Sequence, residues 1–244
     1  MDDMTIRLRS FSAVLAGGLA VVGLSACGPG ETFEDDASLN ERVTSVRLDT
    51  GTGSVTLRGQ KGLGKVSVHR KVTYHGDKPD GATHRFDDGR LVLDGCGDDC
   101  KVDYTVEVPA GVPVEGETSR GDASLSNVGA VELKTSSGNV TLEGVTGRVK
   151  ARTSNGDISG SELLGSRIEA ETSNGEIDLT PRKAQDIRAR TSNGELTVNV
   201  PDSSYRISVK TGNGDKHLGI HNDPAGQHRL DLTSGNGDIT VKPA

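Results

Sequence analysis

The chain lacks tryptophan and has few other aromatic residues, with three Phe and three Tyr among 244 residues. Hydrophobic residues make up only 32% of the sequence, whereas glycine accounts for 33 residues. This composition excludes a thick aromatic core. A thin core of Val, Ile, Leu, Ala and Thr, one or two side chains wide, suits stacked β-structure instead.

Basic residues are also scarce relative to acidic ones. The chain has 28 Lys and Arg against 35 Asp and Glu, which gives a net charge of −7. Nucleic acid binding depends on a basic surface that neutralises phosphates along the backbone. The overall charge therefore predicts no nucleic acid partner.

Only three cysteines are present, and the first follows an apolar N-terminal segment. Arg7 and Arg9 precede an apolar run over residues 11–24. This run is shorter than the roughly 20 residues of a membrane-spanning helix and is typical of a signal peptide. The tetrapeptide Leu-Ser-Ala-Cys that ends at Cys27 resembles a bacterial lipobox. Residues 1–26 are therefore predicted to be a lipoprotein signal peptide; the alternative is a buried N-terminal helix with a free cysteine.

The lipobox predicts that Cys27 carries lipid, palmitate included, and that this lipid holds the protein on the membrane rather than through it. The expected location is the outer face of the bacterial cell membrane. Residues 27–42 are polar and lack periodicity, so they are expected to form a flexible tether.

Disulfides persist outside the cytoplasm, and Cys96 and Cys100 lie only four positions apart. We predict that they form a disulfide, which stabilises modestly because the closed loop is short. The alternative is a metal site in which both thiolates bind together with an aspartate between them.

One short phrase recurs along the chain. Thr-Ser-Asn-Gly occurs at 153–156, 172–175 and 191–194, and each copy is followed by an acidic and then an aliphatic residue. From Gly121 to Gly237 the spacing between successive glycines of this kind is 17–23 residues. A period near 19 is typical of a repeat architecture, and a repeated phrase is not a single active site. The predicted structural turns lie at Asn155, Gly156, Asn174, Gly175, Asn193, Gly194, Asn213, Gly214, Asn236 and Gly237.

Apolar and polar residues alternate on both sides of each Asn-Gly pair, which predicts β-strands. In an antiparallel meander each pair would form a hairpin, whereas in a parallel solenoid each repeat would form one coil. We favour the solenoid because the phrase recurs by repeat and not by mirror image. The predicted fold is therefore all-β: a parallel β-solenoid of about seven coils, 17–23 residues each, over 111–244, preceded by an irregular all-β N-terminal cap over 43–110.

Stacking in sequence order gives specific expectations for the outward side chains. Glu171 should lie between Arg152 and Arg190, an arrangement that favours this register. In the same column, Lys210 should follow Arg190. The residues after the turn glycines should form an acidic edge, at Asp157, Glu176, Glu195, Asp215 and Asp238.

These features together resemble a known family. The run 104–109, Tyr-Thr-Val-Glu-Val-Pro, precedes repeated Thr-x-x-Gly-[Asp/Glu/Asn]-[Ile/Val/Leu] units. This pattern is similar to the bacterial "putative adhesin" domain of unknown function, a family of cell-envelope β-solenoids, over about residues 43–242. The resemblance implies an adhesion-type role and supplies no catalytic residues. The chain departs from the pattern at Lys216, where an aliphatic residue is expected, so we expect a distorted coil there.

Two metal-binding hypotheses stay open beside a prediction of no metal and no cofactor. Carboxylate and Asn oxygens along the acidic edge could bind Ca²⁺, although the further glycines of calcium-binding repeats are missing. The alternative is that the acids face water. His217, His221 and His228 could ligate a metal, or the insertion 216–229 that holds them is a surface loop.

The sequence predicts no enzyme. No Gly-x-Ser-x-Gly phrase precedes a helix, and a glycan-acting β-helix enzyme would need paired carboxylates at a groove. The predicted function is a non-catalytic adhesion, binding or structural module of the envelope, whose partner is an envelope protein or a cell-wall polymer. The alternatives are an accessory or sensor module in envelope-stress signalling and a glycan-acting enzyme. Lys242 and Pro243 are typical of edge protection, which favours a monomer.

Overall fold

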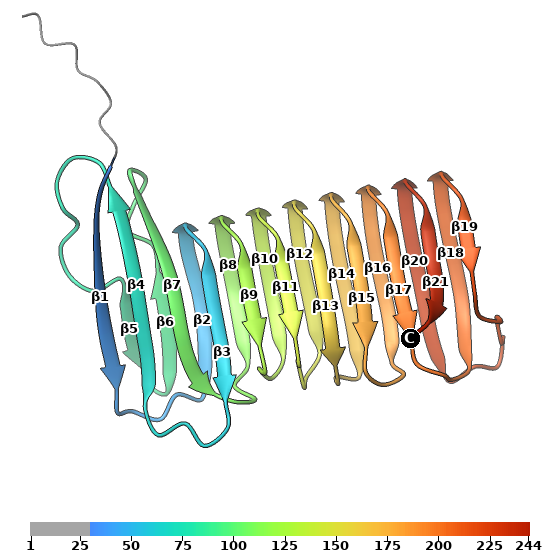
Figure 1. The fold of residues 1–244 in the computed structure, drawn as a ribbon, viewed down its shortest axis with the longest axis horizontal. Coiled ribbons are helices and arrows are strands. Elements are labelled where there is room, and N and C mark those ends of the chain that lie inside the picture. Colours follow the sequence, from blue (N-terminus) through green and yellow to red (C-terminus); the bar gives the residue numbers. More distant parts are fainter. Residues whose placement is uncertain (1–29) are drawn as a thin grey trace, which may run out of the picture.

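The structure, a computed structural model, describes residues 30–244, so the predicted signal peptide and Cys27 lie outside the described residues. The described part consists of β-strands, with no helix among its elements. Figure 1 shows these strands as an elongated stack of coils. The predicted all-β solenoid is confirmed. Within residues 30–244, no helix is long and apolar enough to cross a membrane.

Two sheets face each other and enclose the core, and we call the eleven-stranded one sheet A and the ten-stranded one sheet B. In spatial order, sheet A contains β1 (Glu31–Leu39), β4 (Val66–Tyr74), β7 (Cys100–Pro109), β3 (Val55–Gln60), β9 (Ala123–Ser126), β11 (Val140–Glu143), β13 (Ile158–Leu163), β15 (Ile177–Pro181), β17 (Leu196–Val200), β21 (Ile239–Pro243) and β19 (Lys216–Leu218). Sheet B contains β18 (Tyr205–Asn213), β20 (His228–Asn236), β16 (Asp186–Asn193), β14 (Arg167–Asn174), β12 (Val149–Asn155), β10 (Val131–Ser137), β8 (Val114–Arg120), β2 (Ser45–Thr52), β6 (Arg90–Asp94) and β5 (His84–Asp87).

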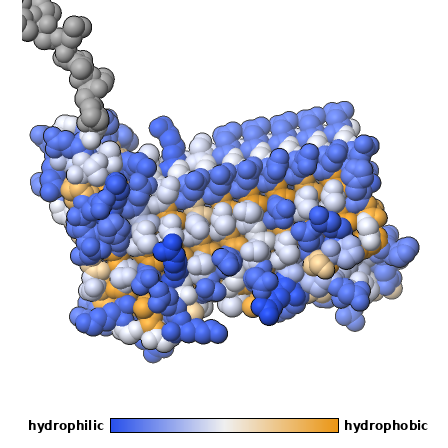
Figure 2. Space-filling view, in the orientation of Figure 1, coloured by the Kyte–Doolittle hydropathy of each residue, from blue (hydrophilic) through white to orange (hydrophobic). Residues whose placement is uncertain are grey.

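Each regular coil runs through one strand of sheet B, turns at a glycine and continues through one strand of sheet A. Neighbouring coils are parallel and in register, so Ile168 of β14 pairs with Val149 of β12 and with Ile187 of β16. Because alternate residues of a strand point to opposite faces, the inward Val, Ile, Leu and Ala side chains form one continuous narrow core. Figure 2 shows the result on the viewed face: hydrophilic residues in rows along the long axis, with hydrophobic bands between them.

The coils after residue 111 number seven, as predicted, but they do not stack in sequence order. The coil β20/β21 lies between β16/β17 and β18/β19, so the chain steps over one level and then returns. The expected neighbours Arg190 and Lys210 are therefore separated, because Thr233 pairs with both of them. The expected position of Glu171, between Arg152 and Arg190, is confirmed.

This order changes which strands form the edges of the solenoid. The C-terminal strand β21 pairs with β17 on one side and with β19 on the other, so Lys242 and Pro243 do not protect an edge. The edges at this end are β18 and β19. Lys216 of β19 is the register partner of the buried Ile239 of β21. Lys216 is exposed because no further coil covers it. Its departure from the repeat pattern thus marks the open end.

The N-terminal region is more regular than the cap expected over 43–110. The coil β2/β3 pairs in parallel with β8/β9 on one side and with β6/β7 on the other, so the solenoid extends two levels further. The antiparallel cap consists of β1 and β4 in sheet A and of β5 in sheet B.

The tether expected over 27–42 is wrong for Glu31–Leu39, which forms β1 and pairs along its whole length with β4. Phe33, Ala37 and Leu39 alternate and pack against the core. The alternation is interrupted in the sequence by Asp35, which pairs with the buried Arg70. Because of this polar residue at an inward position, the sequence pattern did not predict the strand.

Candidate functional site

The predicted turn residues lie in one line along the stack. Asn174 Nδ2 donates to Asn155 Oδ1 at 3.0 Å, and Asn193 Nδ2 donates to Asn174 Oδ1 at 3.0 Å. Asn236 continues the series to Asn193 at 2.8 Å, and Asn213 to Asn236 at 2.7 Å. The five side chains form an unbroken amide ladder that follows the spatial order of the coils.

Glycine is required beside this ladder. Gly175 has φ +150°, and a Cβ atom there would lie 2.1 Å from the carbonyl oxygen of Gly156 on the neighbouring coil. The Thr172 hydroxyl donates to the same oxygen at 3.0 Å. Each Thr-Ser-Asn-Gly phrase therefore contacts the phrase of the next coil, and its recurrence is explained by stacking.

Part of the acidic edge also serves the fold. Asp157 Oδ1 accepts the backbone N–H of Glu176 at 2.8 Å, and Asp238 Oδ1 accepts that of Asp215 at 2.8 Å. Over residues 30–244, no group of three or more His, Cys, Asp or Glu lies in an arrangement that could hold a metal ion.

The histidines of the 216–229 insertion are divided between the two sheets. His217 lies in β19 of sheet A, whereas His228 lies in β20 of sheet B, with its ring centroid 5.9 Å from that of Tyr205. In the N-terminal part, Cys96 and Cys100 form a disulfide with a Cα–Cα distance of 5.6 Å, which closes the turn between β6 and β7.

The outer face of sheet B carries an ordered array of charged side chains, which we call the charged face. Its residues come from eight adjacent strands, β2 to β18, and are aligned because those strands are in register. One column contains Arg47, Glu115, Glu132, Lys150, Glu169, Arg188, Asp231 and Ser208, and a second contains Asp49, Glu117, Lys134, Arg152, Glu171, Arg190, Thr233 and Lys210. A shorter third column contains Arg167, Asp186, Arg229 and Arg206.

Ion pairs cross between the strands of the charged face. Arg152 Nε lies 3.1 Å from Glu171 Oε2, and Lys150 pairs with Glu132. The hydrogen bond from Lys150 lowers the pKa of Glu132 below its usual value. Exposed pairs of this kind contribute only about 0–1 kcal/mol each, so they define a charge pattern more than they stabilise the fold.

Arginines dominate the C-terminal part of the charged face. Arg188, Arg190 and Arg229 all approach Asp231, at 3.9, 3.6 and 4.0 Å. A cavity of about 320 Å³ opens beside them and is lined by Arg167, Asp186, Ile187, Arg188, Arg229 and Asp231. Sequence reasoning missed this cluster because it forms only when β20 inserts beside β16. The available signal was the Arg-x-Arg phrase at 188–190.

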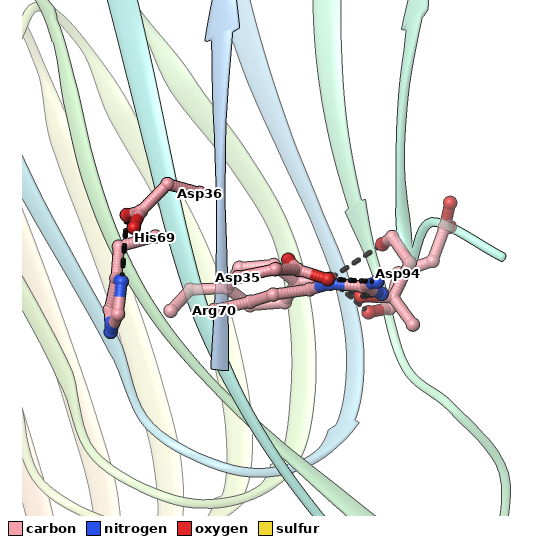
Figure 3. A network of polar contacts seen from close by, with 7 residues as sticks. Asp35, Asp36, His69, Arg70 and Asp94 are labelled. Atoms are coloured by element: carbon pink, nitrogen blue, oxygen red, sulfur yellow. Dashed lines mark hydrogen bonds and ion pairs between the residues drawn. The ribbon is translucent and has the colours of Figure 1, made fainter. Parts of the chain in front are cut away.

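A second polar cluster joins β1 to β4 within the cap (Figure 3). The buried Arg70 donates from Nε and Nη2 to the two Asp35 oxygens, both at 2.6 Å, and from Nη1 to Thr83 Oγ1 at 3.1 Å. The hydrogen bond from Arg70 holds the pKa of Asp35 below its usual value. Behind this pair, burial raises the pKa of Tyr104 to about 12, and its hydroxyl donates to the Asp94 carbonyl oxygen at 2.9 Å. These contacts position a strand and leave no charge unpaired.

The family is decided by the repeats themselves. The model of the Toastrack DUF4097 family matches residues 112–242. This chain belongs to the Toastrack DUF4097 family. The Toastrack match begins just before β8 and ends in β21, so it spans the seven coils after residue 111 and the whole arginine cluster. Residues 43–111, which the sequence resemblance also included, lie outside the match.

Comparison with other proteins adds weaker similarities. A structure titled a "putative cell adhesion protein" from Clostridium sporogenes is 15% identical, with 88% of this chain and 100% of that chain covered and a TM-score of 0.41. Structures titled a "putative adhesin", from Bacteroides fragilis and Parabacteroides merdae, are 13% and 12% identical; each comparison covers 88% of this chain and 97% of the other, with a TM-score of 0.44. No curated protein matches this chain. At these identities and scores, the similarities carry no functional argument.

Proposed function

We propose that this Toastrack protein is a lipoprotein held at the outer face of the bacterial membrane, and that its solenoid is a non-catalytic binding module of the envelope. The lipobox supports an anchor at Cys27. Only Gly28, Pro29 and Gly30 separate this cysteine from β1. Four Cα-to-Cα steps extend at most about 14 Å, so the lipid would hold the cap close to the membrane surface.

The charged face is the observation that carries the binding role. Eight strands in register present columns of charged side chains at the inter-strand spacing of about 4.8 Å. A partner with regularly repeated charged groups, on an envelope protein or a cell-wall polymer, could meet such an array at several points at once. Several weak contacts then add to useful avidity.

Three carboxylates of the described residues support a non-catalytic role. A hydrogen bond from a basic neighbour lowers the pKa of Glu34, Asp35 and Glu132 below the usual values. A general acid needs the opposite shift, toward neutral pH. These three carboxylates are therefore suited to ion pairing and not to proton transfer.

Photo-crosslinking in living cells tests the binding role. A photoreactive amino acid placed at Ser208 lies on the charged face, and the same residue placed at Ser159 lies on the outer face of sheet A and serves as the control. We expect adducts from position 208 in excess over position 159. Equal yields, or no adducts from either position, would contradict a binding role for the charged face.

The adduct also separates the two non-catalytic alternatives. A cell-wall polymer or a surface protein would support adhesion, whereas an integral membrane signalling protein would support an accessory role in envelope-stress signalling. Anchoring is tested separately with Cys27→Ala, which should move the protein from the membrane fraction to the soluble fraction and remove the lipid mass. A variant that stays with the membrane would refute the anchor.

A further inference from the structure

The cavity over β14, β16 and β20 is lined by arginines from three strands. Arg167 comes from β14, Arg188 from β16 and Arg229 from β20, and the side chains of Asp186 and Asp231 complete the rim. Arg167 is paired, with its Nε 2.7 Å from Glu169. Among the described residues, Arg188 and Arg229 form ion pairs only with Asp231, with a guanidinium nitrogen 3.9 and 4.0 Å from Oδ2. Arg190 approaches the same oxygen at 3.6 Å.

Positive charge is in excess around this cavity. On the outer faces of β14, β16, β20 and β18, six cations stand against four carboxylates, for a local net charge of +2 in a chain of net charge −7. The opposite part of the charged face, on β2, β8 and β10, has two cations and four carboxylates, for a net charge of −2. The six cations are Arg167, Arg188, Arg190, Arg206, Lys210 and Arg229, and the four carboxylates are Glu169, Glu171, Asp186 and Asp231.

The three arginines that approach Asp231 are held less tightly than Arg70 and Arg152. Arg70 makes a two-pronged pair with Asp35 at 2.6 Å, and Arg152 contacts Glu171 at 3.1 Å. No guanidinium nitrogen approaches Asp231 closer than 3.6 Å. One Asp186 oxygen already accepts the backbone N–H of Arg229 at 2.9 Å. The guanidinium donors of Arg188 and Arg229 are thus available to an additional acceptor.

We propose that this cavity binds a phosphate group of an anionic envelope ligand, an inference that rests on the binding role proposed above. A planar carboxylate accepts one guanidinium fork, whereas a tetrahedral phosphate accepts forks from several directions. The available donors of Arg188 and Arg229 arrive from two strands, with Arg167 of a third strand on the cavity lining, and match the second geometry. A neighbouring cavity of about 290 Å³ shares Arg229 and adds Arg206, so a second phosphate of the same ligand fits beside the first.

The phosphate could belong to a soluble phosphodiester polymer or to a lipid headgroup, and the experiment distinguishes these sources. Full-length lipoprotein in neutral detergent is titrated with tripolyphosphate by calorimetry. The titration is repeated with poly(glycerol phosphate) and, separately, with tripolyphosphate in micelles doped with phosphatidylglycerol. Binding of the polymer with no effect of the lipid indicates a polymer ligand, whereas weaker tripolyphosphate binding in doped micelles indicates a headgroup.

Two double variants with the same change in charge test the site. Arg188→Gln/Arg229→Gln removes two cavity arginines, and we expect it to weaken tripolyphosphate binding about tenfold or more, because charge-assisted hydrogen bonds are lost. The control, Arg47→Gln/Arg152→Gln, removes two charges elsewhere on the charged face and should change binding about twofold at most. Asp231→Asn raises the positive charge of the cavity and should tighten binding, an effect opposite to that of structural damage.

Three results would overturn the proposal: no binding of tripolyphosphate to the wild type, equal losses in both double variants, or tighter binding of poly-glutamate than of tripolyphosphate. These results are independent of the crosslinking experiment. Adducts at position 208 without phosphate binding would leave the binding role standing and remove only the phosphate site.

Discussion

Arg70 donates a bidentate pair of hydrogen bonds, from Nε and Nη2, to the Asp35 carboxylate, at 2.6 Å each. This pair joins β4 to β1. The Arg70 side chain is 7% exposed and that of Asp35 is 43% exposed. Because β1 begins four positions after Cys27, any load on the proposed lipid anchor reaches the solenoid through this strand. The ion pair is therefore placed where the anchor and the fold meet.

Asp35→Asn should loosen β1 selectively. Breaking a buried ion pair costs about 3–5 kcal/mol, and the partial exposure of Asp35 reduces this to about 1–2 kcal/mol for the opening of β1. Hydrogen exchange of the β1 and β4 amides measures that opening. Asp36→Asn is the control, since Asp36 is 81% exposed and pairs with His69 at the surface; it should change the opening by less than about 0.5 kcal/mol. Equal effects of the two variants would contradict the role of the buried pair.

The same pair predicts a pH dependence. The pKa of Asp35 is lowered from 3.8 in the folded protein, mainly by its hydrogen bond to Arg70. The stabilisation is therefore fully present above the unfolded-state value and is lost as pH falls through the lower folded-state pKa. The difference in β1 opening between wild type and Asp35→Asn should be largest near pH 7 and should shrink below about pH 3.8. Proteolysis of β1 by pepsin and by a neutral protease compares the two conditions, and a constant difference would refute the assignment.

Gly175→Ala should be strongly destabilising. The new Cβ would lie 2.1 Å from the Gly156 carbonyl oxygen, at a backbone φ of +150°. Steric overlap and backbone strain each cost about 1–3 kcal/mol, so the apparent free energy of unfolding should fall by about 3 kcal/mol or more. Gly64→Ala is the matched control, because a Cβ at Gly64 would meet nothing within 4 Å. Urea unfolding followed by circular dichroism measures both, and similar midpoints would show that the coils do not stack as closely as described.

The repeated phrase made the solenoid predictable, whereas the spatial order of its coils was not. Stacking in register places Asn174 on Asn155 and Gly175 on Gly156. The period of the sequence therefore equals the number of residues between positions that contact each other in neighbouring coils. The phrases at Asn213 and Asn236 satisfy the same ladder in either order. Local patterning therefore could not show that the last coil in the sequence, β20/β21, lies between β16/β17 and β18/β19 in the stack.

The arginine cluster and β1 were missed for related reasons. The cluster depends on β20 lying beside β16, which brings Asp231 next to Arg188. The strand β1 depends on Arg70, a buried base that makes an inward Asp35 acceptable. Both features arise from residues about 35 to 43 positions apart, and the hydrophobic period of a single segment carries no information about such partners.

Asn193→Ala should weaken the stack at one rung. Asn193 Nδ2 donates to Asn174 Oδ1 at 3.0 Å, and Asn193 Oδ1 accepts from Asn236 Nδ2 at 2.8 Å. Alanine removes both bonds and leaves two amide groups without these partners, although water can reach the exposed ladder. Each hydrogen bond contributes about 0.5–1.5 kcal/mol, so we expect a loss of about 1–2 kcal/mol. The loss should affect mainly β14, β16 and β20, because each coil contacts only its neighbours.

Hydrogen exchange resolved by strand tests this expectation, and Asn199→Ala is the control. Asn199 lies on the outer face of sheet A and donates one side-chain hydrogen bond, to Thr180 at 2.8 Å, outside the ladder. We expect faster exchange in β14, β16 and β20 for Asn193→Ala and a smaller change, confined to β15 and β17, for Asn199→Ala. If both variants exchanged uniformly faster along all coils, the solenoid would unfold as one unit and the ladder would not act locally.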